Sequence, residues 1–306
     1  DIVVFQADFA PDQTRTFTVE AGEMQVYAKE DYRAYGRFVR ERFDDFAWEN
    51  DRIAFRTYGK ALATWEGEPL SSSTVDIWSK RTPRMVINDW YMTDDYHRDY
   101  GEGADLYSAG PTRGCGGNGL WAADRLWASR AFADSRVLAN GPIRLVFELE
   151  YEPFEVNGIS VAEVKRVTLD AGQQLNHYES HYKPYVRPGR EKPLVCGIGL
   201  KKVKGEELAF NEEHGWLAKW EPVKDGSTQG LAIVVDDPER LVEQAEDDLN
   251  HLVLVNVPES SVVSYRAGFC WDKAGHITSF KAWKDYVDNV ARGLASPIEV
   301  TVETVK

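Results

Sequence analysis

The sequence predicts an all-β fold, a large antiparallel sandwich with one or two peripheral helices. Apolar and polar residues alternate with a period of two through many segments, which is the pattern of half-buried strands. Turn-forming residues punctuate these segments, and strands recur about every ten residues, as in sandwich folds. The clearest strand segments are 52–59, 73–80, 143–152, 161–170, 174–183 and 229–236.

Turn signals between the strands support this fold. Asn157-Gly158 lies between two strand patterns and is a strong hairpin signal. Three further turns are expected, at Asp170-Ala171-Gly172, Arg187-Pro188-Gly189 and Lys224-Asp225-Gly226. Because the chain has no inter-domain linker and no internal repeat, residues 1–306 are expected to form a single domain.

Two helices are expected toward the end of the chain. Asp237 provides a cap and Pro238 a first turn for a helix that runs to about Asp248. A second helix follows Ser279 and stops before Pro297. Its apolar positions recur at steps of three and four, at Phe280, Trp283, Tyr286, Val287, Val290 and Leu294. This helix is expected to pack on a sheet, and residues 298–305 to form a last strand.

Charge and composition exclude several classes of function. Lys and Arg number 36 and Asp and Glu 50, a net charge of -14, so binding of nucleic acid through a basic surface is not expected. No apolar run approaches the roughly 20 residues of a membrane helix, and no membrane partner is expected. The start at Asp1 without Met predicts a processed chain from which any signal peptide has been removed. A secreted or periplasmic location is expected.

The three cysteines are expected to be buried free thiols. An odd number excludes a fully paired disulfide framework, although one disulfide is compatible with the count. The cysteines are Cys115, Cys196 and Cys270. No CxxC or Cys/His cluster predicts structural zinc, and neither a metal nor a cofactor is expected.

The segment 90–140 is the strongest functional candidate. It has few strand patterns, and residues 96–121, YHRDYGEGADLYSAGPTRGCGGNGLW, contain seven glycines, which predicts a long Gly-rich active-site loop. The alternative is a tight loop whose glycines serve only to turn the chain. Proton-exchanging, anionic, cationic and stacking side chains stand between the glycines, namely His97, Tyr96, Tyr100, Tyr107, Asp99, Glu102, Asp105, Arg113 and Trp121.

Two strands carry further candidates. Trp48, Asn50 and Arg56 occur where a loop enters a strand, and Arg52 and Arg56 share one strand face, which indicates either salt bridges or an anion site. In 175–183, LNHYESHYK, three side chains point to one side of the strand, namely His177, Glu179 and His181. They form a sugar-facing polar strand, a solvated face or a divalent metal site. The aromatic load of 10 Trp, 14 Tyr and 13 Phe fits sugar stacking, although the core is the more frequent place for any single ring.

A family resemblance rests on four runs of sequence. DDFAWENDRIAFRTYG, YHRDYGEGADLYSAGPTRGCGGNGLW, VLANGPIRLVFELEYEPFEVNG and LDAGQQLN resemble the family called domain of unknown function 4861, over about residues 31–300. The resemblance implies a β-supersandwich like that of galactose mutarotase, and a secreted protein of bacterial polysaccharide-utilisation clusters. It also implies work on plant or algal polysaccharide fragments, as by an oligosaccharide dehydratase of ulvan breakdown. His177 and His181 stand at strand positions where the family is expected to vary.

The implied reaction is β-elimination on a non-reducing-end uronate, by a dehydratase or an exo-lyase, giving a 4,5-unsaturated product. Arg113 or Arg56 would neutralise the carboxylate at C5, and His97 or Tyr107 would take the C5 proton. A Tyr or a protonated His would donate a proton to the C4 oxygen. The expected catalytic residues are His97, Tyr107 and Arg113. The expected substrate-binding residues are Trp48, Asn50, Arg56, Asp105, Trp121, His177, Glu179 and His181.

Two alternatives stay open at this point. A glycoside hydrolase or epimerase would use paired carboxylates from Glu102, Asp105 and Glu179. A carbohydrate-binding module would use aromatic platforms without proton chemistry. The partner in each case is an oligosaccharide, which is acidic for the elimination reaction, and the protein is expected to be a monomer or homodimer.

Overall fold

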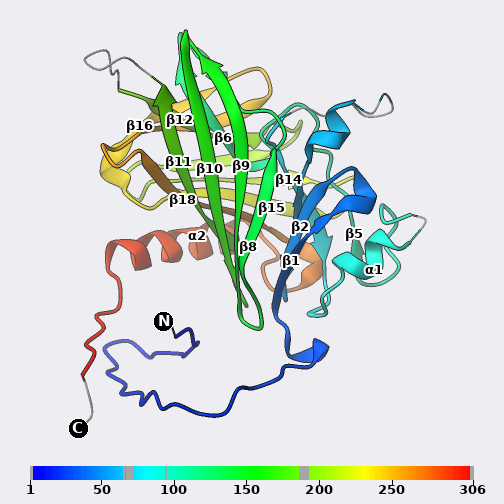
Figure 1. The fold of residues 1–306 in the computed structure, drawn as a ribbon, viewed down its shortest axis with the longest axis vertical. Helices are drawn as coiled ribbons and strands as arrows, with labels where there is room; N and C mark the ends of the chain where they lie inside the picture. Colours follow the sequence, from blue (N-terminus) through cyan, green and yellow to red (C-terminus); the bar gives the residue numbers. More distant parts are fainter. Residues whose placement is uncertain (1–2, 65, 67–71, 94, 186–192, 304–306) are drawn as a thin grey trace.

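The computed structural model describes residues 3–64, 66, 72–93, 95–185 and 193–303. These residues form three antiparallel sheets and two α-helices, which confirms the all-β sandwich (Figure 1). The largest sheet has eight strands in the order β13-β14-β15-β18-β11-β10-β9-β8. Its strands are β8 (Asp134–Asn140), β9 (Arg144–Val156), β10 (Ile159–Asp170), β11 (Leu175–Tyr185), β13 (Glu207–Asn211), β14 (Trp216–Pro222), β15 (Thr228–Val235) and β18 (Val262–Trp271).

Two five-stranded sheets cover the inner face of the eight-stranded sheet. One has the order β1-β2-β3-β4-β5 and the other β16-β17-β12-β6-β7. The first comprises β1 (Ala34–Val39), β2 (Asp45–Asn50), β3 (Ala54–Thr57), β4 (Val75–Lys80) and β5 (Gly103–Ala104). The second comprises β6 (Cys115–Ala122), β7 (Arg125–Trp127), β12 (Val195–Lys201), β16 (Leu241–Glu246) and β17 (Asn250–Asn256). Side chains from all three sheets form one buried apolar core, because each strand turns alternate residues inward.

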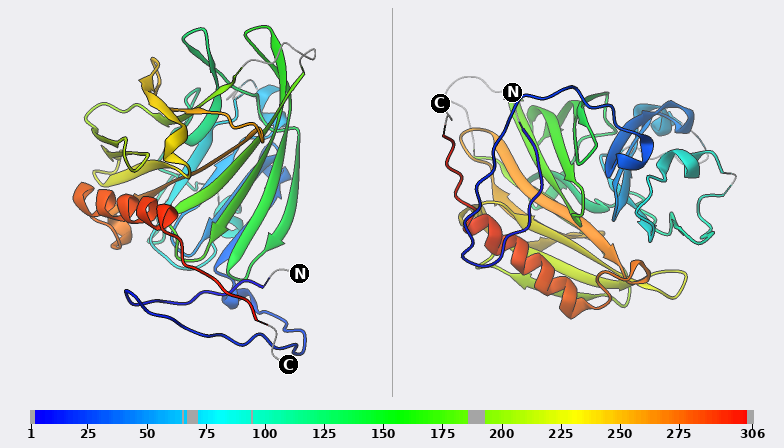
Figure 2. Two further views of the ribbon diagram at one scale, coloured as in Figure 1. Left: turned by 90° about the vertical axis from the view of Figure 1, so that its left-hand side faces the viewer. Right: turned by 90° about the horizontal axis from the view of Figure 1, so that it is seen from below.

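The predicted hairpins and the last helix are confirmed. β9 and β10 pair across Asn157-Gly158, whose φ angles of 47° and 84° suit a two-residue turn. The turns at 170–172 and 224–226 also form, whereas 187–189 lies outside the described residues. Helix α2 (Phe280–Ala295) begins after the Ser279 cap and lies along the outer side of β14 and β15 (Figure 2). Trp283 and Val287 are fully buried there.

Three sequence-based predictions about elements are wrong. Residues 237–248 form a short 3-10 turn and then β16, since pairing with β17 outweighs the local helix signal. Residues 298–303 are exposed and unpaired, so the last strand does not form within the described part of that segment. The segment 90–140 contains β6, β7 and β8, and it is irregular mainly before residue 115. Strand β6 is rich in glycine, which has a low strand propensity, so a propensity-based prediction misses it. Gly119 is required there because a Cβ at this position would lie 2.4 Å from the Trp127 carbonyl oxygen.

The remaining elements are short. Helix α1 (Ile87–Tyr91) covers the outer face of the β1–β5 sheet, and the Glu49 carboxylate accepts hydrogen bonds from the backbone amides of Val86 and Ile87. The 3-10 turns are η1 (Lys29–Asp31), η2 (Arg40–Arg42), η3 (Lys60–Thr64), η4 (Pro238–Arg240) and η5 (Asp272–Ala274). All three cysteines are buried free thiols, as predicted. The described residues include no helix long and apolar enough to cross a membrane.

Candidate active site

Trp48 and Asn50 belong to the core of the protein. The Trp48 ring is 1% exposed and stacks on Phe55, and its indole N–H donates to Asn176 Oδ1 at 2.8 Å. Asn50 donates to the carbonyls of Asp170 and Gln173 at 2.7 and 2.8 Å, which ties β2 to the β10–β11 turn. Neither side chain presents a surface to a sugar, so their expected substrate-binding roles are replaced by structural ones.

Arg56 is the centre of a buried salt-bridge cluster on the outer face of the β1–β5 sheet. Its guanidinium donates to Asp76 and Asp105, at 2.8 Å in each case, and lies 3.9 Å from Asp45. The side chain is 4% exposed, and carboxylates already surround it. This arrangement matches the salt-bridge alternative and not an open anion site. Burial raises the pKa of Asp45 to about 7, although Arg56 and Arg42 oppose that shift.

His97 lies at the surface beside this cluster. Its imidazole is 60% exposed, and Nδ1 is 3.0 Å from the Asp105 carbonyl oxygen. The structure therefore brings three of the predicted site residues, His97, Asp105 and Arg56, into one group. Two cations beside this loop are paired with carboxylates, Arg84 with Glu102 and Arg81 with Asp99, whereas Arg98 lies over the Tyr100 ring. Among the described residues of this loop, Arg98 is balanced by the nearby carboxylates Asp95 and Asp105, so an acidic sugar would meet little excess positive charge there.

A second polar cluster lies between the sheets, on the inner face of β10. Strand β10 turns Val161, Glu163, Lys165, Val167 and Leu169 inward, and each is at most 2% exposed. Glu163 and Lys165 thus occupy positions where the alternation calls for apolar residues. Their charged groups lie 3.8 Å apart. Burying a charge lowers the stability of the folded protein unless the charge is paired, and buried pairs often add little stability. This pair therefore calls for an explanation beyond stability.

Neutral polar side chains from neighbouring strands hold Glu163 in place. Asn118 of β6 donates to Glu163 Oε1 at 3.0 Å, and Ser129 donates to Oε2 at 3.4 Å. The same Asn118 amide reaches Ser180 Oγ at 3.0 Å and the Tyr182 hydroxyl on β11. The cluster therefore links β6 of one layer to β10 and β11 of the other.

Arg113 reaches the same cluster from the start of β6. It is 4% exposed, and its guanidinium donates to Ser73 Oγ at 3.3 Å. Within the described residues it makes no ion pair shorter than 4 Å, and Glu163 and Asp247 are the carboxylates whose charge it senses. Burial lowers the pKa of Arg113 to about 10, so it stays charged at neutral pH.

Two cations lie near Glu163 in this interior cluster, and Asp247 is a second carboxylate that acts on Arg113. Arg113 and Lys165 both interact with Glu163. Burial lowers the pKa of Lys165, Glu163 opposes this effect, and the charge of Arg113 lowers the pKa further. The ammonium group also lies 5.0 Å from the centre of the Tyr151 ring. The cluster therefore places a guanidinium and an ammonium with a lowered pKa near one carboxylate in the protein interior.

The phenols around the cluster are proton donors. Burial raises the pKa of Tyr151 and Tyr182 well above the ordinary value, so both stay protonated at neutral pH. Burial does the same to Tyr107, which is 8% exposed and whose hydroxyl has no partner among the described side chains. Lys201 lies 5.3 Å from the centre of the Tyr107 ring but does not reverse that shift. The direction of this shift favours the protonated phenol of Tyr107, and hence proton donation over action as a phenolate base.

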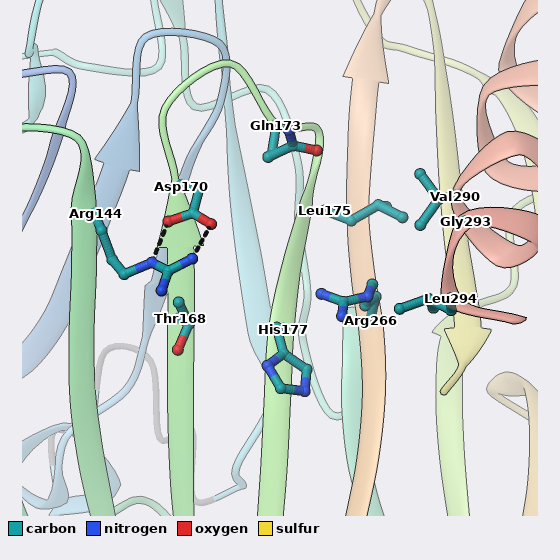
Figure 3. Close-up of a pocket in the computed structure, with 10 residues that line it drawn as sticks. All are labelled: Arg144, Thr168, Asp170, Gln173, Leu175, His177, Arg266, Val290, Gly293 and Leu294. Atoms are coloured by element: carbon teal, nitrogen blue, oxygen red, sulfur yellow. Dashed lines mark hydrogen bonds and ion pairs between the residues drawn. The ribbon is translucent and has the colours of Figure 1, made fainter. Parts of the chain in front are cut away.

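The other predicted side chains lie away from the interior. His177, Glu179 and His181 are half-buried on the outer face of β11, on the opposite side from Tyr182, as the alternation predicted. Trp121 is half-buried near the end of β6. A pocket opens beside His177, between the outer face of the eight-stranded sheet and helix α2 (Figure 3).

The sequence analysis missed the interior cluster, although the sequence contains a signal for it. In VAEVKRVTLD the inward positions read Val161, Glu163, Lys165, Val167 and Leu169. Two charges at consecutive inward positions of a core strand mark a site, because a purely structural core would use apolar residues there. The Gly-rich segment drew attention instead to the surface around His97.

Comparison with known proteins gives a family match. The model of the family described as Domain of unknown function (DUF4861) matches residues 1–300. Uncharacterized protein P7 of Formosa agariphila is 32% identical over 317 residues, which cover 99% of this chain and 78% of that protein. No solved structure matches the chain.

Proposed function

We propose that this chain, which belongs to the DUF4861 family, is a carbon–oxygen lyase that acts on oligosaccharides. It would catalyse β-elimination on a non-reducing-end uronic acid, as a dehydratase or exo-lyase, during breakdown of an acidic plant or algal polysaccharide such as ulvan. The observation that carries the proposal is the interior cluster, in which Arg113 and Lys165 are buried near the carboxylate of Glu163. A secreted or periplasmic location is part of the same proposal.

The cluster supplies the groups that elimination requires. Arg113 binds the substrate carboxylate at C5 and stabilises the negative charge that develops there. Lys165, as the neutral amine, removes the C5 proton. The electrons of the broken C5–H bond form the C4–C5 double bond, and the C4–O bond breaks. Tyr182 donates its proton to the departing oxygen, which leaves as water from a dehydratase substrate or as a sugar hydroxyl from a lyase substrate.

The alternatives receive less support from the same geometry. Each of the three carboxylates considered for hydrolysis has another place in the structure: Glu102 binds Arg84, Asp105 is buried against Arg56, and Glu179 lies on the outer face of β11. Hydrolysis needs two carboxyl groups about 5–10 Å apart across one sugar. A binding module gains nothing from a buried Lys–Glu pair, since burial of the charges costs stability.

The test is an assay of uronic-acid oligosaccharides by ultraviolet absorbance and mass spectrometry. Growth of the conjugated-alkene absorbance with loss of one water establishes a dehydratase, and the same absorbance with release of a sugar establishes a lyase. New reducing ends without that absorbance support a hydrolase. Bound ligand without any reaction supports a binding module, and either of the last two results contradicts the proposal.

A further inference from the structure

A pocket of about 370 Å³ lies on the outer face of the eight-stranded sheet, away from the interior cluster. Residues of β9, β10, β11 and β18 form its floor, and the last turns of helix α2 form one wall (Figure 3). Volumes of roughly 300–1,000 Å³ are typical of small-molecule sites. The interior cluster and this pocket occupy opposite faces of β10 and β11, because side chains alternate along a strand.

The polar side of the pocket contains Arg266, whose guanidinium group makes few polar contacts. The Arg266 guanidinium lies 3.4 Å from Asp236 Oδ1, and this is its one polar contact within the described residues. Figure 3 shows Arg266 reaching from β18 toward β11, beside Leu294 of helix α2. The neighbouring Arg144 is different, since Asp170 binds it through two contacts of 2.6 and 2.7 Å. Arg266 is therefore the guanidinium available to an incoming anion.

His177 lies next to Arg266, and contacts with Ser264 and Asp236 fix the orientation of its ring. Its Nε2 contacts Ser264 Oγ at 2.7 Å and lies 3.1 Å from Asp236 Oδ2. Ser264 and Asp236 thus meet at the same ring nitrogen, which is not the arrangement of a nucleophilic triad, where serine and carboxylate use different nitrogens. The Nδ1 atom makes no hydrogen bond in the described part of the chain. The side chain is fixed in place and has one nitrogen for a ligand.

The opposite side of the pocket is apolar. Leu175 of β11 is buried there, and Val290 and Leu294 of helix α2 are half-buried and pack against the same apolar cluster. A sugar ring has this same division, with an apolar C–H face and a polar edge. Thr168 and Gln173 also line the pocket and provide hydrogen-bonding groups for hydroxyls.

We infer that this outer pocket is an ancillary binding site for one uronate residue of an acidic oligosaccharide. The carboxylate pairs with Arg266, and Nδ1 of His177 accepts a hydrogen bond from a sugar hydroxyl, while the ring packs against Leu294. The choice of a uronate rests on the proposed function, but the site itself rests on the pocket. Such a site holds a longer chain on the protein independently of the interior cluster, which takes the chain end.

Calorimetric titration with a galacturonate trimer tests the inference, and a neutral galactose trimer serves as the comparison ligand. We expect two binding events in the wild type, and Arg266→Gln to weaken one of them about tenfold or more. Leu294→Glu, which puts a carboxylate at the rim, is expected to weaken the same event. The control is Arg166→Gln, since Arg166 lies on the same sheet face outside the pocket and is paired with Glu148.

The titration results either support or overturn the outer binding site. Unchanged binding by both Arg266→Gln and Leu294→Glu overturns the site, as does equal affinity of the wild type for the neutral trimer. Arg113→Gln is expected to remove the other binding event and leave this one. If the uronate binds through Arg266 but no unsaturated product forms from any substrate, the ancillary site stands and the proposed lyase activity fails.

Discussion

At the scale of single residues, Lys165 is the side chain whose presence structure alone explains least. Its side chain is 2% exposed, and the positive charge of Arg113 repels its ammonium group. We predict that replacing both members of the buried pair, Lys165→Met together with Glu163→Leu, leaves the free energy of unfolding unchanged or raises it by about 1 kcal/mol, because no charge is then buried without its partner. Chemical denaturation measures this. A loss of several kcal/mol would instead make this pair structural.

Asp45 gives a pH-dependent prediction. Burial raises its pKa in the folded protein to about 7, above the value of the unfolded chain. A group with a raised folded-state pKa stabilises the protein at low pH, and this contribution disappears as pH rises through that value. Asp45→Asn does not titrate, so its stability relative to the wild type is expected to increase between about pH 5 and about pH 8. Denaturation curves at the two pH values check this, and a constant difference contradicts it.

Sequence reasoning predicted that some residues would lie together and misjudged the burial of others, for identifiable reasons. His97, Asp105 and Arg56 do gather, because the Gly-rich loop folds over the outer face of β3 and β4. Trp48 and Asn50 were expected at a sugar surface, but residue type alone does not distinguish a buried ring from an exposed one. The interior cluster depends on β6, β10 and β11 meeting across two layers, and such long-range contacts are not encoded in local spacing.

At the scale of elements, close packing at glycine positions stabilises the β6–β7 hairpin. A Cβ at Gly119 would meet the Trp127 carbonyl oxygen at 2.4 Å, so Gly119→Ala is expected to destabilise the β6–β7 hairpin by about 1–3 kcal/mol. The matched control is Gly293→Ala in helix α2, where nothing lies within 4 Å of the new Cβ. That variant is expected to stabilise the protein by up to about 1 kcal/mol, from helix propensity. Thermal unfolding of the two variants checks the opposite signs, and a shift in the same direction would contradict the packing argument.

The elements with strong local signals were predictable, and those set by partners were not. Helix α2 has a cap, a regular apolar stripe and a following proline, and all three appear in the sequence. Strand β16 carries a helix-like start at Asp237 and Pro238, yet its pairing with β17 determines the outcome. Residues 298–303 alternate like a strand but lack a partner within the described chain.

At the scale of the whole molecule, the net charge of -14 opposes the approach of an acidic sugar. Added salt screens this long-range repulsion and so favours association with the substrate, whereas it screens the buried contacts at Arg113 much less. We therefore predict that kcat/KM on a uronic-acid oligosaccharide rises about two- to threefold as salt is raised from low ionic strength to about 0.2 M. Initial rates across a salt series measure this. A steep fall with salt would indicate binding through exposed cations.

The most direct test of the account compares formation of the 4,5-unsaturated product by the wild type, Lys165→Gln and Lys219→Gln. Lys219 is also buried on an inward position of the same sheet, but it pairs with Glu206 and Glu221, outside the proposed site. We predict at least about a 100-fold loss of rate for Lys165→Gln, the size expected for removing a general base, with folding intact by thermal unfolding and most of the rate kept by folded Lys219→Gln. Full activity in folded Lys165→Gln would contradict the assignment of the interior cluster as the active site.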